Sequence, residues 1–86
     1  MYIKDIIEKI INKWDPIDLI SSYAPRDEYQ YEIYLLNDWY CNNIVDLTGL
    51  ANAIYNIFIH SFGKDVFCKT YDDCKKVAMD IVAQID

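Results

Sequence analysis

Few side chains in this 86-residue chain could carry out chemistry, and their spacing favours structural roles. His60 is the only histidine, and no serine or cysteine can be paired with it from the sequence. It lies near the end of an expected helix, where a histidine is ordinary because its charged form suits the helix dipole. We therefore expect no catalytic residue and no enzymatic activity.

The cysteines Cys41, Cys68 and Cys74 are odd in number, and none of their spacings is Cys-x-x-Cys. This pattern argues against a disulfide scaffold and against a zinc site, and it favours a reducing cytoplasm. The glycines Gly49 and Gly63 stand alone, so a glycine-rich phosphate loop is not expected. We expect no cofactor.

Five carboxylates lie between positions 15 and 32: Asp15, Asp18, Asp27, Glu28 and Glu32. They could in principle surround a divalent metal. However, they lack the alternation of a calcium loop and the Glu-x-x-His of a di-iron bundle, so we expect no metal. Capping of helix starts and binding of a partner are the interpretations that remain.

The net charge of −6 is concentrated in the middle of the chain. Residues 15–46 contain seven carboxylates and a single basic residue, Arg26. This is the wrong sign for a protein that binds the phosphate backbone, so nucleic acid is not expected as a partner. A basic protein is the natural complement.

The length and the composition predict one helical domain, residues 1–86. The hydrophobic share is 53%, with only two glycines and two prolines, which argues against disorder and against a fold with many tight turns. Charges interrupt the apolar residues of positions 1–8, so we expect neither a signal peptide nor a membrane span.

The first helix is expected over residues 2–14. Its apolar side chains recur at helical spacing on one face: Ile3, Ile6, Ile7, Ile10, Ile11 and Trp14. Asp15 before Pro16 then predicts a new helix start, with a short helix over 15–23. The same arrangement recurs at Pro25, where Asp27 and Glu28 are expected in the first turn of the next helix.

That next helix is expected over residues 26–41. Tyr29, Ile33, Leu36 and Tyr40 share its apolar face, and the carboxylates Glu28, Glu32 and Asp38 are expected to face solvent.

The segment 47–62 is apolar over more than one face and is the expected central helix. Asp46 is its expected cap and Gly63 its expected end. Val66 and Phe67 should fold back onto the core, and Thr70 with Asp73 resembles a capping box before a last helix to the C-terminus. The predicted fold is thus an all-α bundle of four to five helices around a central one.

Several short motifs of the chain are shared with one family: Trp14-Asp15-Pro16-Ile17-Asp18-Leu19, Ala24-Pro25, Asp27-Glu28-Tyr29, Glu32 and Ser61-Phe62-Gly63. With these motifs the chain resembles the YugE-like family of small bacillus and clostridium proteins, a domain of unknown function. The resemblance covers most of the chain. It implies a compact α-helical domain without known enzymatic activity. The motif positions expected to be structural are Trp14, Asp15, Pro16, Asp27, Tyr29 and Gly63.

A similar Trp-Asp-Pro-Ile followed by Asp-Glu-Tyr occurs in small immunity proteins that neutralise bacterial polymorphic toxins. Those proteins are acidic, cytoplasmic and helical. Their motif commonly has glycine after the isoleucine, where this chain has Asp18, and this difference favours the YugE-like group.

Two functions follow as hypotheses. The first is a binding protein, concretely an immunity protein or antitoxin whose acidic surface from Asp18 to Asp38 covers the substrate groove of a basic toxin such as a nuclease. Its expected contact residues are Asp18, Glu28, Tyr31 and Glu32. The second is a structural or regulatory domain that self-associates through exposed tyrosines and Trp39, so the expected state is a monomer or a homodimer.

Overall fold

The computed structural model describes residues 2–18 and 28–85. Over these ranges the chain forms four helices and no strand: α1 (Ile3–Trp14), α2 (Gln30–Asn42), α3 (Leu47–Phe62) and α4 (Tyr71–Ile85). The predicted all-α class is confirmed.

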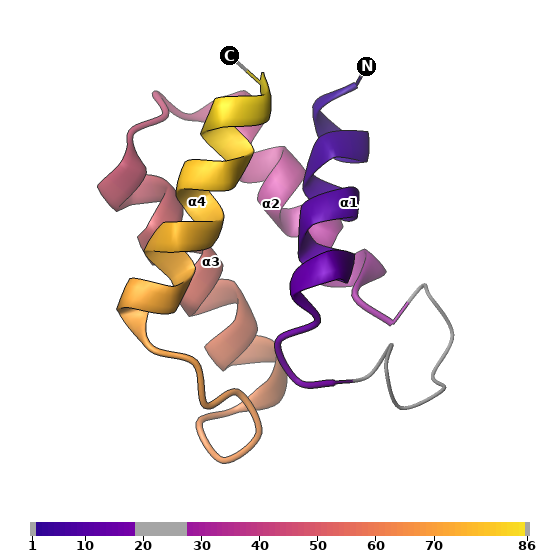
Figure 1. Cartoon of the computed structure of the whole chain (residues 1–86), viewed down its shortest axis with the longest axis vertical. Coiled ribbons are helices and arrows are strands. Elements are labelled where there is room, and N and C mark those ends of the chain that lie inside the picture. Colours follow the sequence, from indigo (N-terminus) through magenta and orange to yellow (C-terminus); the bar gives the residue numbers. More distant parts are fainter. Residues whose placement is uncertain (1, 19–27, 86) are drawn as a thin grey trace.

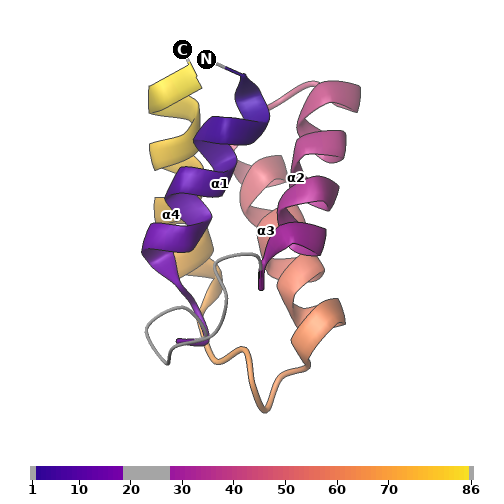
Figure 2. The ribbon, with the colours of Figure 1, turned by 90° about the vertical axis from the view of Figure 1, so that its right-hand side faces the viewer.

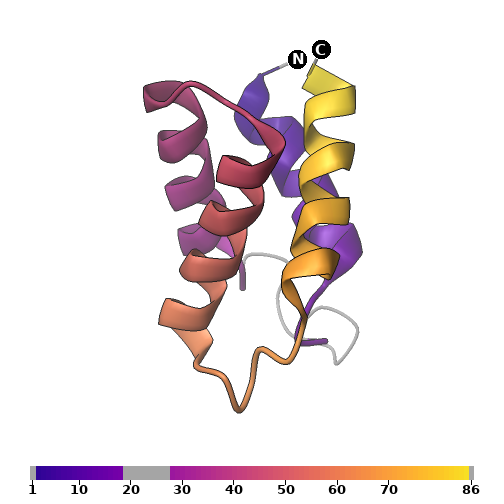
Figure 3. The same cartoon turned by 90° about the vertical axis from the view of Figure 1, so that its left-hand side faces the viewer.

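The helices form a ring in which each one packs against two neighbours. Successive helices run in opposite directions, so the two ends of the chain lie at the same end of the bundle (Figure 1). From one side α1 lies between α4 and α2 (Figure 2), and from the other α3 lies between α2 and α4 (Figure 3). The helix expected at the centre, 47–62, therefore occupies one corner of the ring. Its wide apolar surface serves two neighbours, and it keeps a polar exposed stripe of Thr48, Asn52, Asn56 and His60.

The core fills the space inside the ring. Its buried apolar residues come from every helix: Ile6, Ile7, Ile10, Ile11, Ile33, Leu36, Leu50, Ala51, Ile54, Phe58, Cys74, Val77, Ala78 and Ile81, joined by Tyr29 and Phe67 from the connections. Burial of one large apolar side chain contributes about 1.5–3 kcal/mol, so this set is the main source of stability. Phe67 folds back onto the core as predicted, whereas Val66 is exposed.

The ends of α3 match the prediction. The Asp46 side chain accepts from the backbone N–H of Gly49, and this satisfies one of the free amides of the first turn. Gly63 has a φ of 79°, which favours glycine, and its N–H donates to the carbonyl of Ile59 at 2.8 Å.

The capping box before α4 is also confirmed. The Thr70 hydroxyl accepts from the N–H of Asp73 at 3.2 Å, and the Asp73 carboxylate accepts from the N–H of Thr70 at 2.9 Å. Two free amides at the helix start are thus satisfied reciprocally.

The expected helix start at Asp15 is wrong. Asp15 is the residue that ends α1: it is left-handed, with φ 47° and ψ 61°, and its N–H donates to the carbonyl of Ile11 at 2.8 Å. Residues 16–18 form a turn, and the rest of the expected 15–23 helix lies outside the described residues. Aspartate before proline suits either end of a helix, because proline disfavours helical backbone at the residue before it and commonly follows a helix end.

The start of α2 is later than expected. Residues 28 and 29 form a turn, and Tyr29 precedes the first helical residue without a side-chain cap. Glu28 is therefore outside the first turn of the helix, and its expected capping role is wrong. Pro25 and Asp27 lie outside the described residues.

Candidate functional site

A hydrogen bond joins the Trp-Asp-Pro motif to the Asp-Glu-Tyr motif. The hydroxyl of Tyr29 donates to Oδ1 of Asp15 at 2.6 Å, and it lies 3.4 Å from the backbone nitrogen of Ile17, which donates to it. Tyr29 and Pro16 are both buried. The bond joins the end of α1 to the start of α2, so these motif residues hold the chain together at a corner of the bundle.

Trp14, the last residue of α1, connects this turn to the aromatic residues of the core. Its ring packs edge-on against Phe58 and Phe67, with centroids 5.7 and 6.0 Å apart, and Tyr29 packs against Phe58 at 6.0 Å. Such edge-to-face pairs contribute about 0.5–1.5 kcal/mol each beyond their burial. Trp14, Asp15, Pro16 and Tyr29 thus have structural roles that the geometry accounts for.

Asp18 is exposed and has an unusual backbone. Its φ is 59°, a left-handed value that glycine adopts freely and aspartate tolerates better than most residues. Its N–H donates to the carbonyl of Asp15 at 3.0 Å, so the turn after α1 is closed by the backbone itself.

The outer side of α2 exposes aromatic and acidic side chains together. Tyr31 and Tyr34 are 62% and 58% exposed, and Glu28 and Asp38 are also exposed. Positions 31, 34 and 38 follow the spacing of one helix face, and Glu28 lies in the turn that precedes the helix. We call these four residues the tyrosine–carboxylate face. Tyr34 was missing from the contact residues expected from the sequence, although its spacing from Tyr31 could have indicated it.

Glu32 does not belong to this face, and its expected exposure is wrong. The residue is only 4% exposed, and within the described part of the chain its Oε1 has no hydrogen-bond partner. Position 32 is three residues after Tyr29 and four before Leu36, both buried, so helical geometry turns it inward. Trp39, expected to support self-association, is likewise half-buried against the core.

Among the helices of the described residues, two carry lysine and two carry neither lysine nor arginine. The sequence has no lysine or arginine between positions 27 and 63, so α2 and α3 have none. The basic residues of the helices lie on the other pair: Lys4, Lys9 and Lys13 on α1, and Lys75 and Lys76 on α4. Asp38 therefore has no cation on its own helix, and α3 offers none to Asp38 or to Glu28.

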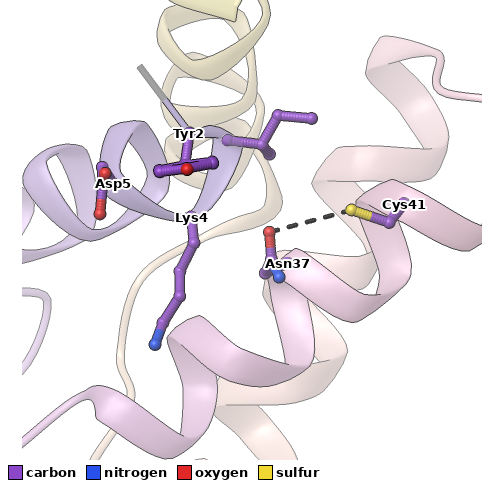
Figure 4. A pocket seen from close by; sticks show the side chains of 6 residues that line it. Tyr2, Lys4, Asp5, Asn37 and Cys41 are labelled. Carbon is purple, nitrogen blue, oxygen red and sulfur yellow. Dashed lines mark hydrogen bonds between the residues drawn. The ribbon is translucent and has the colours of Figure 1, made fainter.

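A groove of about 570 Å³ lies between the start of α1 and the second half of α2 (Figure 4). Its lining residues are Tyr2, Ile3, Lys4, Asp5, Asn37 and Cys41. The thiol of Cys41 lies 3.9 Å from Oδ1 of Asn37, a weak contact on the α2 wall.

The side chains that could take part in catalysis or metal binding do not cluster in the described residues. His60 is exposed on α3, Cys41 and Cys68 are exposed, and Cys74 is buried in the core. Burial raises the pKa of the Cys74 thiol to about 12, which makes it unreactive at neutral pH. Within residues 2–18 and 28–85, no three histidine, cysteine or acidic side chains are grouped as metal ligands would be.

Comparisons with models of protein families, with curated proteins and with solved structures find no match to this chain. None of the helices in the described ranges has the length and apolar character that crossing a bilayer requires.

Proposed function

We propose that this protein is a non-enzymatic binding protein whose tyrosine–carboxylate face engages a basic protein in the cytoplasm of a bacterium. The most concrete case is an immunity protein or antitoxin that blocks a basic toxin such as a nuclease. The observation that carries the proposal is that α2 exposes two tyrosines and Asp38, with the exposed Glu28 in the turn before it, and that neither α2 nor α3 carries a lysine or arginine.

The residue types suit this use. Tyrosine combines a large apolar ring with a polar tip and is enriched where proteins bind one another, so Tyr31 and Tyr34 can serve as anchors. Carboxylates in excess raise the rate of encounter with a positively charged partner and disfavour partners of the same sign. Nucleic acid would be repelled by this surface.

The backbone at Asp18 is compatible with the immunity-protein case, although an aspartate at this position favours the YugE-like group. The similar motif in that group commonly has glycine at this position, and a φ of 59° is a value that glycine adopts without strain. The turn after α1 therefore suits the glycine of that motif as well as the aspartate of this chain.

Self-association is the second candidate, and the exposure of Tyr2 and Ile44 favours it. These residues are 82% and 96% exposed, so covering them in a dimer would remove apolar surface from water. However, two copies meeting through α2 would bring like charges together, and this repulsion opposes the dimer. A basic partner is free of this cost.

Affinity capture from the native cell tests the proposal. The variant Glu28→Gln/Tyr31→Ala/Tyr34→Ala/Asp38→Asn removes the face, and Asp72→Asn/Asp80→Asn on α4 makes the same change in charge at exposed positions elsewhere. We expect the wild type and the α4 variant to recover the same basic protein and the face variant to lose it. Equal recovery by all three, or recovery of no basic protein, would contradict the proposal.

A further inference from the structure

The groove of Figure 4 is continuous with the tyrosine–carboxylate face. Asn37 and Cys41 form its α2 wall, and Tyr34 lies three residues before Asn37. Asp38 lies three residues before Cys41, so it borders the same wall. Residues at these spacings are neighbours on the surface of a helix. A molecule bound to the outer side of α2 would therefore reach the groove directly.

The groove offers mainly apolar surface. The ring of Tyr2, the side chain of Ile3 and the thiol of Cys41 line it, and its volume of about 570 Å³ falls within the ordinary range of binding pockets. Tyr2 is 82% exposed, so covering its ring would remove apolar surface from water. An apolar side chain from another molecule fits this chemistry.

The charges around the groove indicate what that side chain should be attached to. Lys4 and Asp5 carry opposite charges and cancel, and the side chain of Lys4 points away from Cys41 (Figure 4). The remaining charge beside the wall is that of Asp38 on α2, with Glu28 in the turn before the start of that helix. A segment with lysine or arginine next to its apolar residue complements this arrangement.

We propose that the groove receives one aromatic or large aliphatic side chain of the basic partner, while lysines or arginines beside it in the partner's sequence lie over Asp38 and Glu28. This inference rests on the proposed function and specifies the partner's binding segment: an apolar residue flanked by basic ones.

Peptide titration followed by nuclear magnetic resonance tests the inference. The probe is a short peptide with one tryptophan between pairs of lysines, and two controls replace the tryptophan by alanine or every lysine by glutamate. We expect the probe to shift the backbone amide signals of Ile3, Asn37 and Cys41. Each control should bind at least about fivefold more weakly. Unchanged amide signals in the groove, or equal affinity for the three peptides, would overturn the inference.

A groove-filling variant separates this inference from the proposed function. Cys41→Phe should weaken the probe at least about fivefold, and Cys68→Phe, at the other exposed thiol, should not. If Cys41→Phe binds the probe normally while Asp38→Asn/Tyr34→Ala does not, the groove inference fails and the binding face stands. If neither variant weakens the probe, both fail.

Chemical blocking of the folded protein gives the same test without a folding risk. In a Cys68→Ser background, a maleimide carrying a phenyl group should label Cys41 alone, because Cys74 is buried and its pKa is raised. Labelling should abolish the probe's shifts in the groove, and persistence of those shifts would contradict the inference. Groove signals that move with protein concentration alone would instead assign the groove to a second copy of this chain.

Discussion

At the scale of single residues, the Asp15–Tyr29 hydrogen bond gives the motif a physical explanation. Replacing Tyr29 by phenylalanine keeps the ring against Phe58 but removes the hydroxyl from a half-buried carboxylate. We expect Tyr29→Phe to lower the free energy of unfolding by about 1–3 kcal/mol in urea denaturation. Tyr31→Phe, at an exposed tyrosine, should change it by less than about 0.5 kcal/mol. Similar small effects for both would show that the bond contributes little.

The left-handed backbone of Asp18 is a second residue-scale feature. Glycine relieves the strain of positive φ, whereas alanine keeps it and loses the local polar interactions of aspartate. We expect Asp18→Gly to be more stable than Asp18→Ala by about 1 kcal/mol in thermal or urea unfolding. Both variants remove the carboxylate, so the difference between them isolates the backbone. If alanine proves at least as stable as glycine, the turn is not left-handed in solution.

Glu32 is the buried carboxylate of α2, and its environment predicts a gain in stability on replacement. A buried charge without a full set of partners is costly, and an apolar side chain of similar length avoids that cost. Glu32→Met should raise the free energy of unfolding by about 1–3 kcal/mol, while Glu28→Met at an exposed position should change it by less than about 0.5 kcal/mol. Destabilisation by Glu32→Met would show that the carboxylate has a stabilising partner.

At the scale of elements, the capping box of α4 predicts a dependence on pH. Hydrogen bonds from the backbone and side chain of Thr70 hold the pKa of Asp73 below its ordinary value of 3.8. A carboxyl group with a lowered pKa in the folded state stabilises it above the unfolded pKa, and this contribution is lost as the pH falls through the folded pKa.

Melting temperatures of the wild type and Asp73→Asn check this dependence. We expect the wild type to be the more stable at pH 6 and the gap to narrow below about pH 4, as the carboxylate takes up its proton. A gap that stays constant from pH 6 to the acid limit would contradict the assignment of this cap.

The sequence predicts the ends of the helix α3 well, but it does not predict the turn that follows α1. The start and end of α3 are predicted because its stripe of Leu50, Ile54 and Phe58 is bounded by a capping aspartate and a glycine, each with one clear meaning. The corner at Asp15 is not, because aspartate–proline is compatible with the start and with the end of a helix.

The candidate site is also predicted only in part from the sequence. The exposure of Tyr31 is predictable from its place opposite the apolar stripe of α2. The burial of Glu32 is not, because its charge indicates exposure while its position faces the packed interior, and the neighbours that bury it come from distant parts of the chain. The groove beside Cys41 is beyond sequence reasoning for a similar reason, since it exists only where α1 crosses α2.

At the scale of the whole molecule, the bundle is divided by charge. The pair α1 and α4 carries lysines, whereas α2 and α3 carry none. The central claim is that this division directs a basic protein to the outer side of α2. A net negative charge spread evenly over the surface would attract a basic protein to every side of the bundle. The test must therefore compare carboxylates on the α2 side with carboxylates elsewhere.

The most direct test is the rate at which the captured basic protein associates with this chain, measured by stopped-flow over a range of salt concentrations. We predict that Glu28→Gln/Asp38→Asn slows association about threefold or more at low salt, and that Asp72→Asn/Asp80→Asn has a clearly smaller effect. The difference should shrink as salt shortens the Debye length to about 8 Å at physiological ionic strength. Equal slowing by the two variants, or none by either, would contradict the account.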